Sequence, residues 1–188
     1  MLNMTKIDKN PMDKPTRLEL LRIKAVADYL MGRGAGEALL GGGEVTVTRS
    51  ASTGRVKNVY VDGVMVATVR ASDGFLLPSI EGARRLLAKG VGRKVVVQSD
   101  VAEYIAFGRN VFAKHVVAAD DDIRAGDEVI VVDEGNRLLA VGKARLSGHE
   151  MMRFKRGIAV RVRRSIGCLL YTSPSPRDLS TSRMPSSA

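Results

Sequence analysis

Residues 124–147 read RAGDEVIVVDEGNRLLAVGKARLS, and the alternation of apolar and turn residues in this stretch decides the fold of the second half of the chain. The apolar run Val129–Val132 is too short for a typical helix. Gly135-Asn136 then allows the chain to turn back into a second apolar run, Leu138–Val141. We therefore expect two paired strands here.

The sequence on both sides of this hairpin predicts further short strands around one helix. Ser99 or Asp100 caps a predicted helix over Val101–Phe107, which Gly108 ends in a left-handed conformation. A short helical turn is expected within Ser147–Phe154. The other predicted strands are Val95–Val97, Val111–Ala113, Val116–Ala118 and Ile158–Val162. Short strands at this spacing with a single helix predict a small, partly closed barrel over residues 94–166.

The first half of the chain has a different pattern, which predicts a small α+β module over residues 16–93. Thr16, with Glu19 three residues later, forms a capping-box signature for a first helix. The GRGAGE stretch that follows (32–37) is interpreted as a turn, since it lacks the spacing of a dinucleotide-binding fingerprint. A three-stranded meander and a second helix complete the module; the segments are Val45–Thr48, Val56–Val61, Val64–Val69 and, after Ser79, Ile80 to Gly90.

The two ends of the chain are read separately from the fold. Residues 1–15 are polar, and we expect a flexible N-terminus. Residues 168–188 read CLLYTSPSPRDLSTSRMPSSA and match the translation of a sequencing-library adapter. We interpret this segment as adapter read-through that is not native, with a natural disordered tail as the alternative. The only cysteine of the chain, Cys168, lies in it.

Composition limits the classes of function. The chain has 188 residues, with 30 Lys and Arg against 20 Asp and Glu, and so a formal net charge of +10. No apolar run approaches the roughly 18 residues needed to cross a bilayer, and the N-terminus lacks a signal-peptide core. A membrane protein and a disulfide-rich secreted domain are excluded, and a cytoplasmic location is expected. The positive charge favours a nucleic-acid partner.

Three blocks of sequence resemble a PUA domain: GRNVFAKHV (108–116), RAGDEVIVVDEGNRLLAVGKARLS (124–147) and KRGIAVRVRR (155–164). Three earlier blocks resemble the module that precedes the PUA domain in archaeal tRNA-guanine transglycosylases and archaeosine synthases: RIKAVADYLMGRGAGEALL (22–40), SASTGRVKNVYVDG (50–63) and ATVRASDGF (67–75). The resemblance implies an α+β pre-PUA module followed by a PUA-type mixed barrel. Those enzymes also carry a large catalytic barrel, for which this chain has no room. It resembles short archaeal proteins that have only the two modules.

A run of basic residues near the end of the predicted barrel is the strongest site signal. Alternation along the last strand places Arg161 and Arg163 on one face, opposite the apolar positions. We interpret this run as a phosphate-facing stripe, since arginine can engage phosphate bidentately; a solvated edge with gatekeeping charges is the alternative. The run comprises Arg153, Lys155, Arg156, Arg161, Arg163 and Arg164. In the PUA family the corresponding helix and glycine loop lie against RNA, which marks Gly108, Arg109, Asn110, Lys114 and Lys143 as further contact candidates.

Seven aromatic residues precede Cys168. Most of them lie at positions that fit the apolar periodicity of a helix or strand. The set is Tyr29, Tyr60, Phe75, Tyr104, Phe107, Phe112 and Phe154. We therefore expect most of these rings to pack in the core, and no stacking platform for bases is evident. Recognition of structured RNA by backbone charge and shape is favoured over readout of individual bases.

The sequence suggests no catalytic residue, metal site or cofactor. His115 and His149 have no native cysteine to join them, and Asp120–Asp122 lacks the spacing of a calcium loop. The leading hypothesis is a non-catalytic RNA-binding protein that binds the acceptor stem and 3′ end of tRNA. By resemblance it is an accessory or targeting subunit in archaeosine-type tRNA modification, whose partner is a tRNA-guanine transglycosylase-type catalytic subunit. The alternatives are a translation or ribosome-assembly factor that uses the barrel as an adaptor for rRNA or protein, and an enzyme in its own right.

Overall fold

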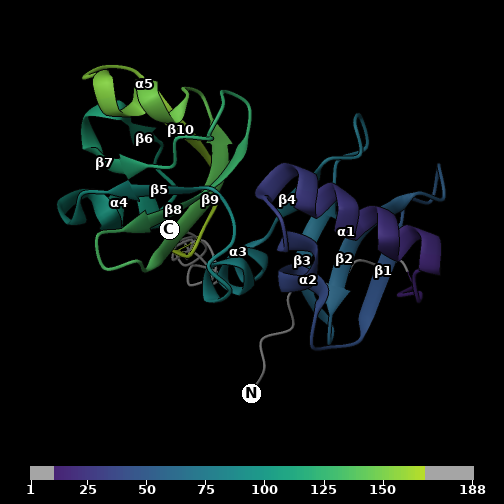
Figure 1. Ribbon diagram of the computed structural model, residues 1–188. Helices are drawn as coiled ribbons and strands as arrows, with labels where there is room; N and C mark the ends of the chain where they lie inside the picture. The colour runs from purple at the N-terminus through teal and green to yellow at the C-terminus, as the bar shows by residue number, and fades with distance from the viewer. Residues whose placement is uncertain (1–10, 168–188) are drawn as a thin grey trace, which may run out of the picture.

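The computed structural model describes residues 11–167, which form two modules in sequence (Figure 1). The first, called the sheet module, contains α1 (Arg17–Met31), α2 (Ala35–Leu40), β1 (Val45–Arg49), β2 (Val56–Val61), β3 (Val64–Val69), β4 (Leu76–Pro78) and α3 (Ile80–Ala88). The second, called the barrel, contains β5 (Lys94–Val97), η1 (Ser99–Val101), α4 (Ala102–Ala106), β6 (Val111–Phe112), η2 (Ala113–His115), β7 (Val116–Ala119), β8 (Glu128–Asp133), β9 (Leu138–Ala144), α5 (Gly148–Arg153) and β10 (Ile158–Ser165).

In the sheet module, four antiparallel strands lie in the order β1-β2-β3-β4. Helices α1 and α2 lie across one face of this sheet (Figure 1). The predicted capping box is present, since the Thr16 hydroxyl accepts from the Glu19 N–H and Glu19 accepts from the Thr16 N–H. Buried Ala27, Val59 and Val61 belong to the core between helices and sheet. Apolar residues alternate along each predicted strand because one face of the sheet packs on helices.

Two elements of the sheet module were not predicted. The GRGAGE stretch ends α1 at Gly32 but then starts α2, where the Asp28 carboxylate accepts from the N–H of Gly36 at 2.7 Å. A Cβ atom at Gly36 would lie 2.7 Å from the Lys24 Cα atom, so this glycine allows α1 and α2 to approach closely. Strand β4 pairs with β3 at the edge of the sheet, where Pro78 is tolerated.

The barrel is a six-stranded sheet in the order β6-β10-β9-β8-β5-β7, and it is nearly closed. Only the β5–β8 pair is parallel among the described strands. The edge strands β6 and β7 are joined directly by η2. The interior of the barrel is apolar and includes Val95, Val97, Ile105, Val129, Val131, Met151 and Val160. The prediction of an α+β chain with a small mixed barrel in its second half is confirmed.

The modules are joined through an apolar contact. Ile130 and Val132 on β8, with Val141 on β9, point away from the barrel interior and belong to the core of the sheet module. The Arg93 guanidinium, at the start of the barrel, donates to the carbonyl of Leu30 at the end of α1. Successive side chains of β8 therefore pack in two different cores. Ile130 and Val132 pack in the core of the sheet module, and Val129 and Val131 face the barrel interior.

Part of the N-terminal segment expected to be flexible is paired with the sheet. Asp13 and Val47 exchange two backbone hydrogen bonds, of 2.9 and 2.8 Å, along the edge of β1. Residues 1–10 lie outside the described residues. So do residues 168–188, to which the adapter interpretation applies.

Candidate nucleic-acid interface

The loop between α4 and β6 is built around Gly108. This residue has φ +93°, as the sequence predicted, and its N–H donates to the Ile105 carbonyl at 2.9 Å. The Asn110 side chain then accepts from the N–H of Val162 at 3.1 Å and ties the loop to β10. Of the predicted contact residues here, Gly108 and Arg109 are exposed, whereas Asn110 is partly buried and holds the loop in place.

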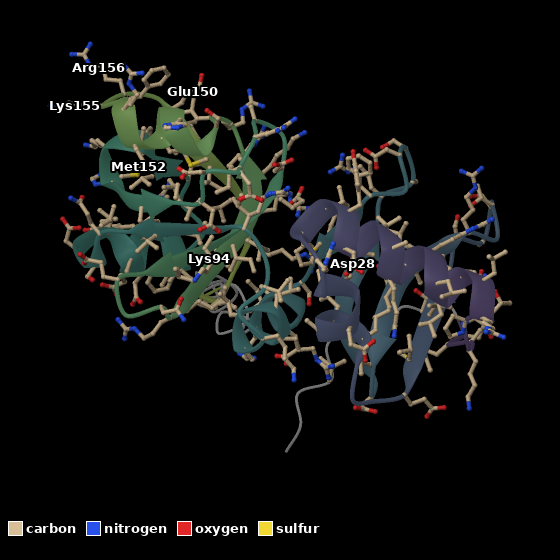
Figure 2. All side chains as sticks on the ribbon, viewed as in Figure 1. Asp28, Lys94, Glu150, Met152, Lys155 and Arg156 are labelled. Atoms are coloured by element: carbon tan, nitrogen blue, oxygen red, sulfur yellow. The ribbon has the colours of Figure 1, made fainter. Side chains whose placement is uncertain are left out.

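A basic hollow of about 480 Å³ opens beside β6. Its lining comprises Phe112, Lys114, His115, Lys155, Arg156 and Gly157. The N–H of Ala113 donates to the Gly157 carbonyl at 3.0 Å, which brings residues far apart in the sequence to one place. Figure 2 shows Lys155 and Arg156 at the end of the barrel beyond α5, away from the sheet module. Within residues 11–167, the side chains of Lys114, Lys155 and Arg156 are not paired with a carboxylate.

A second hollow, of about 380 Å³, adjoins the first. Phe112 and His115 line both, and the second also contains Tyr104, Arg109 and Asn110. We call the surface formed by Tyr104, Arg109, Phe112, Lys114, His115, Lys155 and Arg156 the β6 face. It combines unpaired cations with exposed rings, the combination that suits the phosphates and bases of RNA.

The remaining predicted residues lie elsewhere on the barrel. Gly108, Arg163 and Arg164 line a cleft of about 460 Å³ between the modules, beside Phe107 and Ile80. Lys143 and Arg161 are direct cross-strand partners on β9 and β10. Arg153 is exposed in the last turn of α5. The eleven residues therefore form neighbouring groups around the barrel rather than one stripe along a strand.

Arg163 differs from the other cations because a buried carboxylate balances its charge. Its guanidinium pairs with Glu128, whose side chain is only 4% exposed and whose Oε1 lies 3.5 Å from Nη2 of Arg70 in the sheet module. Burial raises the pKa of Glu128, and the nearby positive charges of Arg163, Arg70 and Lys143 oppose this shift. The local sequence around Arg163 contains no acid, but the fold supplies one from 35 residues away.

The expectation that most aromatic rings pack in the core is wrong. Of the seven, only Tyr60 is buried. Tyr29, Phe75, Tyr104, Phe107, Phe112 and Phe154 are all exposed. Apolar periodicity did not show which side chains faced outward. The available signal was an adjacent glycine at Phe75 and Phe107 and the adjacent basic residues at Phe154. Rings suitable for base stacking are therefore present on the barrel surface.

No group of three or more His, Cys, Asp or Glu in residues 11–167 could hold a metal ion. No helix in the same region is long and apolar enough to span a bilayer.

Comparison with known families agrees with this geometry. The profile of the patch-forming domain C2 of tRNA-guanine transglycosylase matches residues 21–90, and that of the PUA domain matches residues 93–166. The chain is a C2–PUA pair of the tRNA-guanine transglycosylase type. The sheet module is thus the C2 domain, and the barrel is the PUA domain.

Curated relatives of this C2–PUA chain are named tRNA-guanine(15) transglycosylase. The protein of Methanobrevibacter smithii is 42% identical over 150 residues, which cover 79% of this chain and 23% of the relative. That of Pyrococcus furiosus is 45% identical over 158 residues, covering 82% and 26%. The chain thus spans about a quarter of the length of these relatives.

Solved structures of similar size share the fold. A hypothetical protein from Pyrococcus horikoshii matches with a TM-score of 0.67 at 25% identity, covering 82% of this chain and 94% of that one. A conserved PUA domain protein from Thermoplasma acidophilum matches with a TM-score of 0.64 at 25% identity, covering 84% and 95%. The two-domain arrangement therefore also occurs in short chains.

Proposed function

We propose that this C2–PUA chain binds the acceptor stem and 3′ end of tRNA and acts as an accessory or targeting subunit in archaeosine-type tRNA modification. The observation that carries the proposal is the β6 face, where Arg109, Lys114, Lys155 and Arg156 have no carboxylate partner among the described residues. Cations on such a surface attract the phosphate backbone and release its counterions on binding. The family match supports tRNA as the RNA concerned.

The proposal places the base-exchange chemistry on a different polypeptide. The matched families are a patch-forming domain and a PUA domain, and the relatives that carry the transglycosylase name are much longer proteins. We propose a transglycosylase-type catalytic subunit as the partner and the cytoplasm as the shared location. In this arrangement the C2–PUA chain supplies affinity for tRNA, and the partner supplies the reaction.

A titration of the full chain against intact tRNA and against tRNA lacking its terminal CCA tests the proposal. Recognition of the acceptor end predicts weaker binding after trimming. Equal affinity for trimmed tRNA, intact tRNA and an rRNA fragment would contradict it and favour an adaptor role. A guanine-exchange assay of the chain alone should show no turnover, and measurable exchange would refute the non-catalytic assignment.

A further inference from the structure

A hollow of about 510 Å³ in the C2 domain, called the α1 hollow, lies between α1 and two turns of the sheet. One turn joins β1 to β2 and the other joins β3 to β4, and both project from the same end of the sheet (Figure 1). The apolar part of the lining belongs to the core between helices and sheet, and comprises Ile23, Val26, Val56, Val69 and Leu76. An apolar side chain placed in the hollow would therefore contact the edge of that core.

The two turns beside the α1 hollow are built alike. In each, the N–H of the first residue donates to the carbonyl of the last at 2.8 Å, and a glycine with positive φ precedes the last residue. The bonded pairs are Ser50–Arg55 and Arg70–Phe75, and the glycines are Gly54 (φ +65°) and Gly74 (φ +74°). Because these bonds fix the turns in advance, a ligand that binds between them has little backbone to order.

The α1 hollow carries charges of both signs, and its two carboxylates are each paired with a nearby arginine. These pairs are Glu19–Arg49 at 2.6 Å and Asp73–Arg70 at 2.7 Å. Two further arginines of the lining, Arg22 on α1 and Arg55 in the first turn, are exposed. Neither has a carboxylate partner within residues 11–167. Both guanidinium groups therefore have charge available for an acidic ligand.

This combination fits a segment of protein better than RNA. A site for RNA needs an excess of cations near the phosphates, whereas Glu19 and Asp73 lie in the same hollow and disfavour them. The described lining also contains no aromatic ring on which a base could stack. An apolar centre within a polar rim is typical of protein interfaces. Leu18, which is 57% exposed and lies one turn before Arg22 on α1, extends the apolar surface.

We propose that the α1 hollow binds an acidic segment of the transglycosylase-type catalytic subunit. An apolar side chain of that segment lies between α1 and the two turns, and its carboxylates pair with Arg22 and Arg55. This inference rests on the proposed function, which places catalysis on a separate polypeptide, and it adds the surface that binds that polypeptide. Lys155 and Arg156 of the β6 face lie at the end of the barrel away from the sheet module (Figure 2). The chain therefore has separate surfaces for tRNA and for the enzyme.

The test measures binding of the full chain to a shortened Methanobrevibacter smithii transglycosylase by isothermal titration calorimetry. The shortened enzyme lacks the 150 residues that match this chain, and circular dichroism checks that it is folded. Arg22→Ala with Arg55→Ala should weaken binding by about tenfold or more, the loss typical of charged residues central to an interface. The matched control, Arg33→Ala with Lys89→Ala, removes two exposed cations of the same domain outside the hollow and should leave the affinity unchanged.

Leu18→Ser tests the apolar part of the contact without a change of charge. It should weaken binding of the shortened enzyme and leave tRNA affinity unchanged, and its melting temperature should match the wild type because the side chain is exposed. No binding of the shortened enzyme by the wild-type chain, or an equal loss in the control double variant, would overturn the inference.

Binding of tRNA separates this inference from the proposed function. The Arg22 and Arg55 double variant should bind tRNA as well as the control double variant, since both remove two positive charges. A larger loss of tRNA affinity in the former would assign the α1 hollow to RNA and overturn the inference. Failure of the wild-type chain to bind tRNA would instead refute the proposed function.

Discussion

Removal of two cations from the β6 face should reduce the salt dependence of tRNA binding by a calculable amount. Lys155 and Arg156 both line the basic hollow and have no carboxylate partner within residues 11–167. Each neutralised phosphate contributes about 0.7 to 0.9 to the slope of log affinity against log salt concentration, depending on whether the RNA is single-stranded or helical. If each cation engages one phosphate, Lys155→Ala with Arg156→Ala should lower the magnitude of this slope by about 1.4–1.8.

The assay is fluorescence anisotropy of end-labelled tRNA over a series of salt concentrations, with the full chain and the double variant. Matched controls are Arg84→Ala and Arg137→Ala, since each arginine is paired with a neighbouring acid, at 2.5 Å for Glu81 and 2.6 Å for Asp133. These variants should leave the slope unchanged. An unchanged slope in the double variant would show that Lys155 and Arg156 engage no phosphate. An equal fall in the controls would show that total charge rather than the β6 face governs binding.

Three further predictions concern stability, each measured by urea unfolding. Gly82→Ala should cost about 2–3 kcal/mol, because its Cβ atom would lie 2.1 Å from the Val66 carbonyl oxygen; a smaller loss would mean that the backbone yields easily. Arg49 lowers the pKa of Glu19 to about 2, so the wild type should lose stability relative to Glu19→Gln as the pH falls from about 4.5 to 2. Burial raises the pKa of Glu128, so lowering the pH from 7 to 5 should stabilise the wild type relative to Glu128→Gln; the opposite trend would show that its ion pairs outweigh burial.

Local signals in the sequence were sufficient for most of the fold. The Thr16 and Glu19 pair located the start of α1, and Ser79, whose hydroxyl accepts from the N–H of Gly82, marked the start of α3. Both signals involve residues three positions apart, so interactions between sequence neighbours are enough to form them. Strand β4 was missed because a short pair of leucines before Pro78 has no alternation of its own; it is defined only by pairing with β3.

The site was less predictable because its contacts join distant residues. The candidates Lys114, Lys155 and Arg156 do line one hollow, but only the pairing of β6 with β10 brings them together. Arg163 was grouped with them by its sequence neighbours, whereas its ion pair comes from Glu128 on another strand. The sequence thus predicted a ligand that carries phosphates, and the tertiary pairing determines which of these cations have no carboxylate partner among the described residues.

Amide chemical-shift mapping of the isotopically labelled chain during a tRNA titration tests the location of the interface most directly. If tRNA binds the β6 face, the largest changes should fall on residues 104–116 and 153–158, and the exposed surface of α1 should be unaffected. Changes confined to the C2 domain, or spread evenly over both domains, would contradict the assignment of RNA binding to the β6 face.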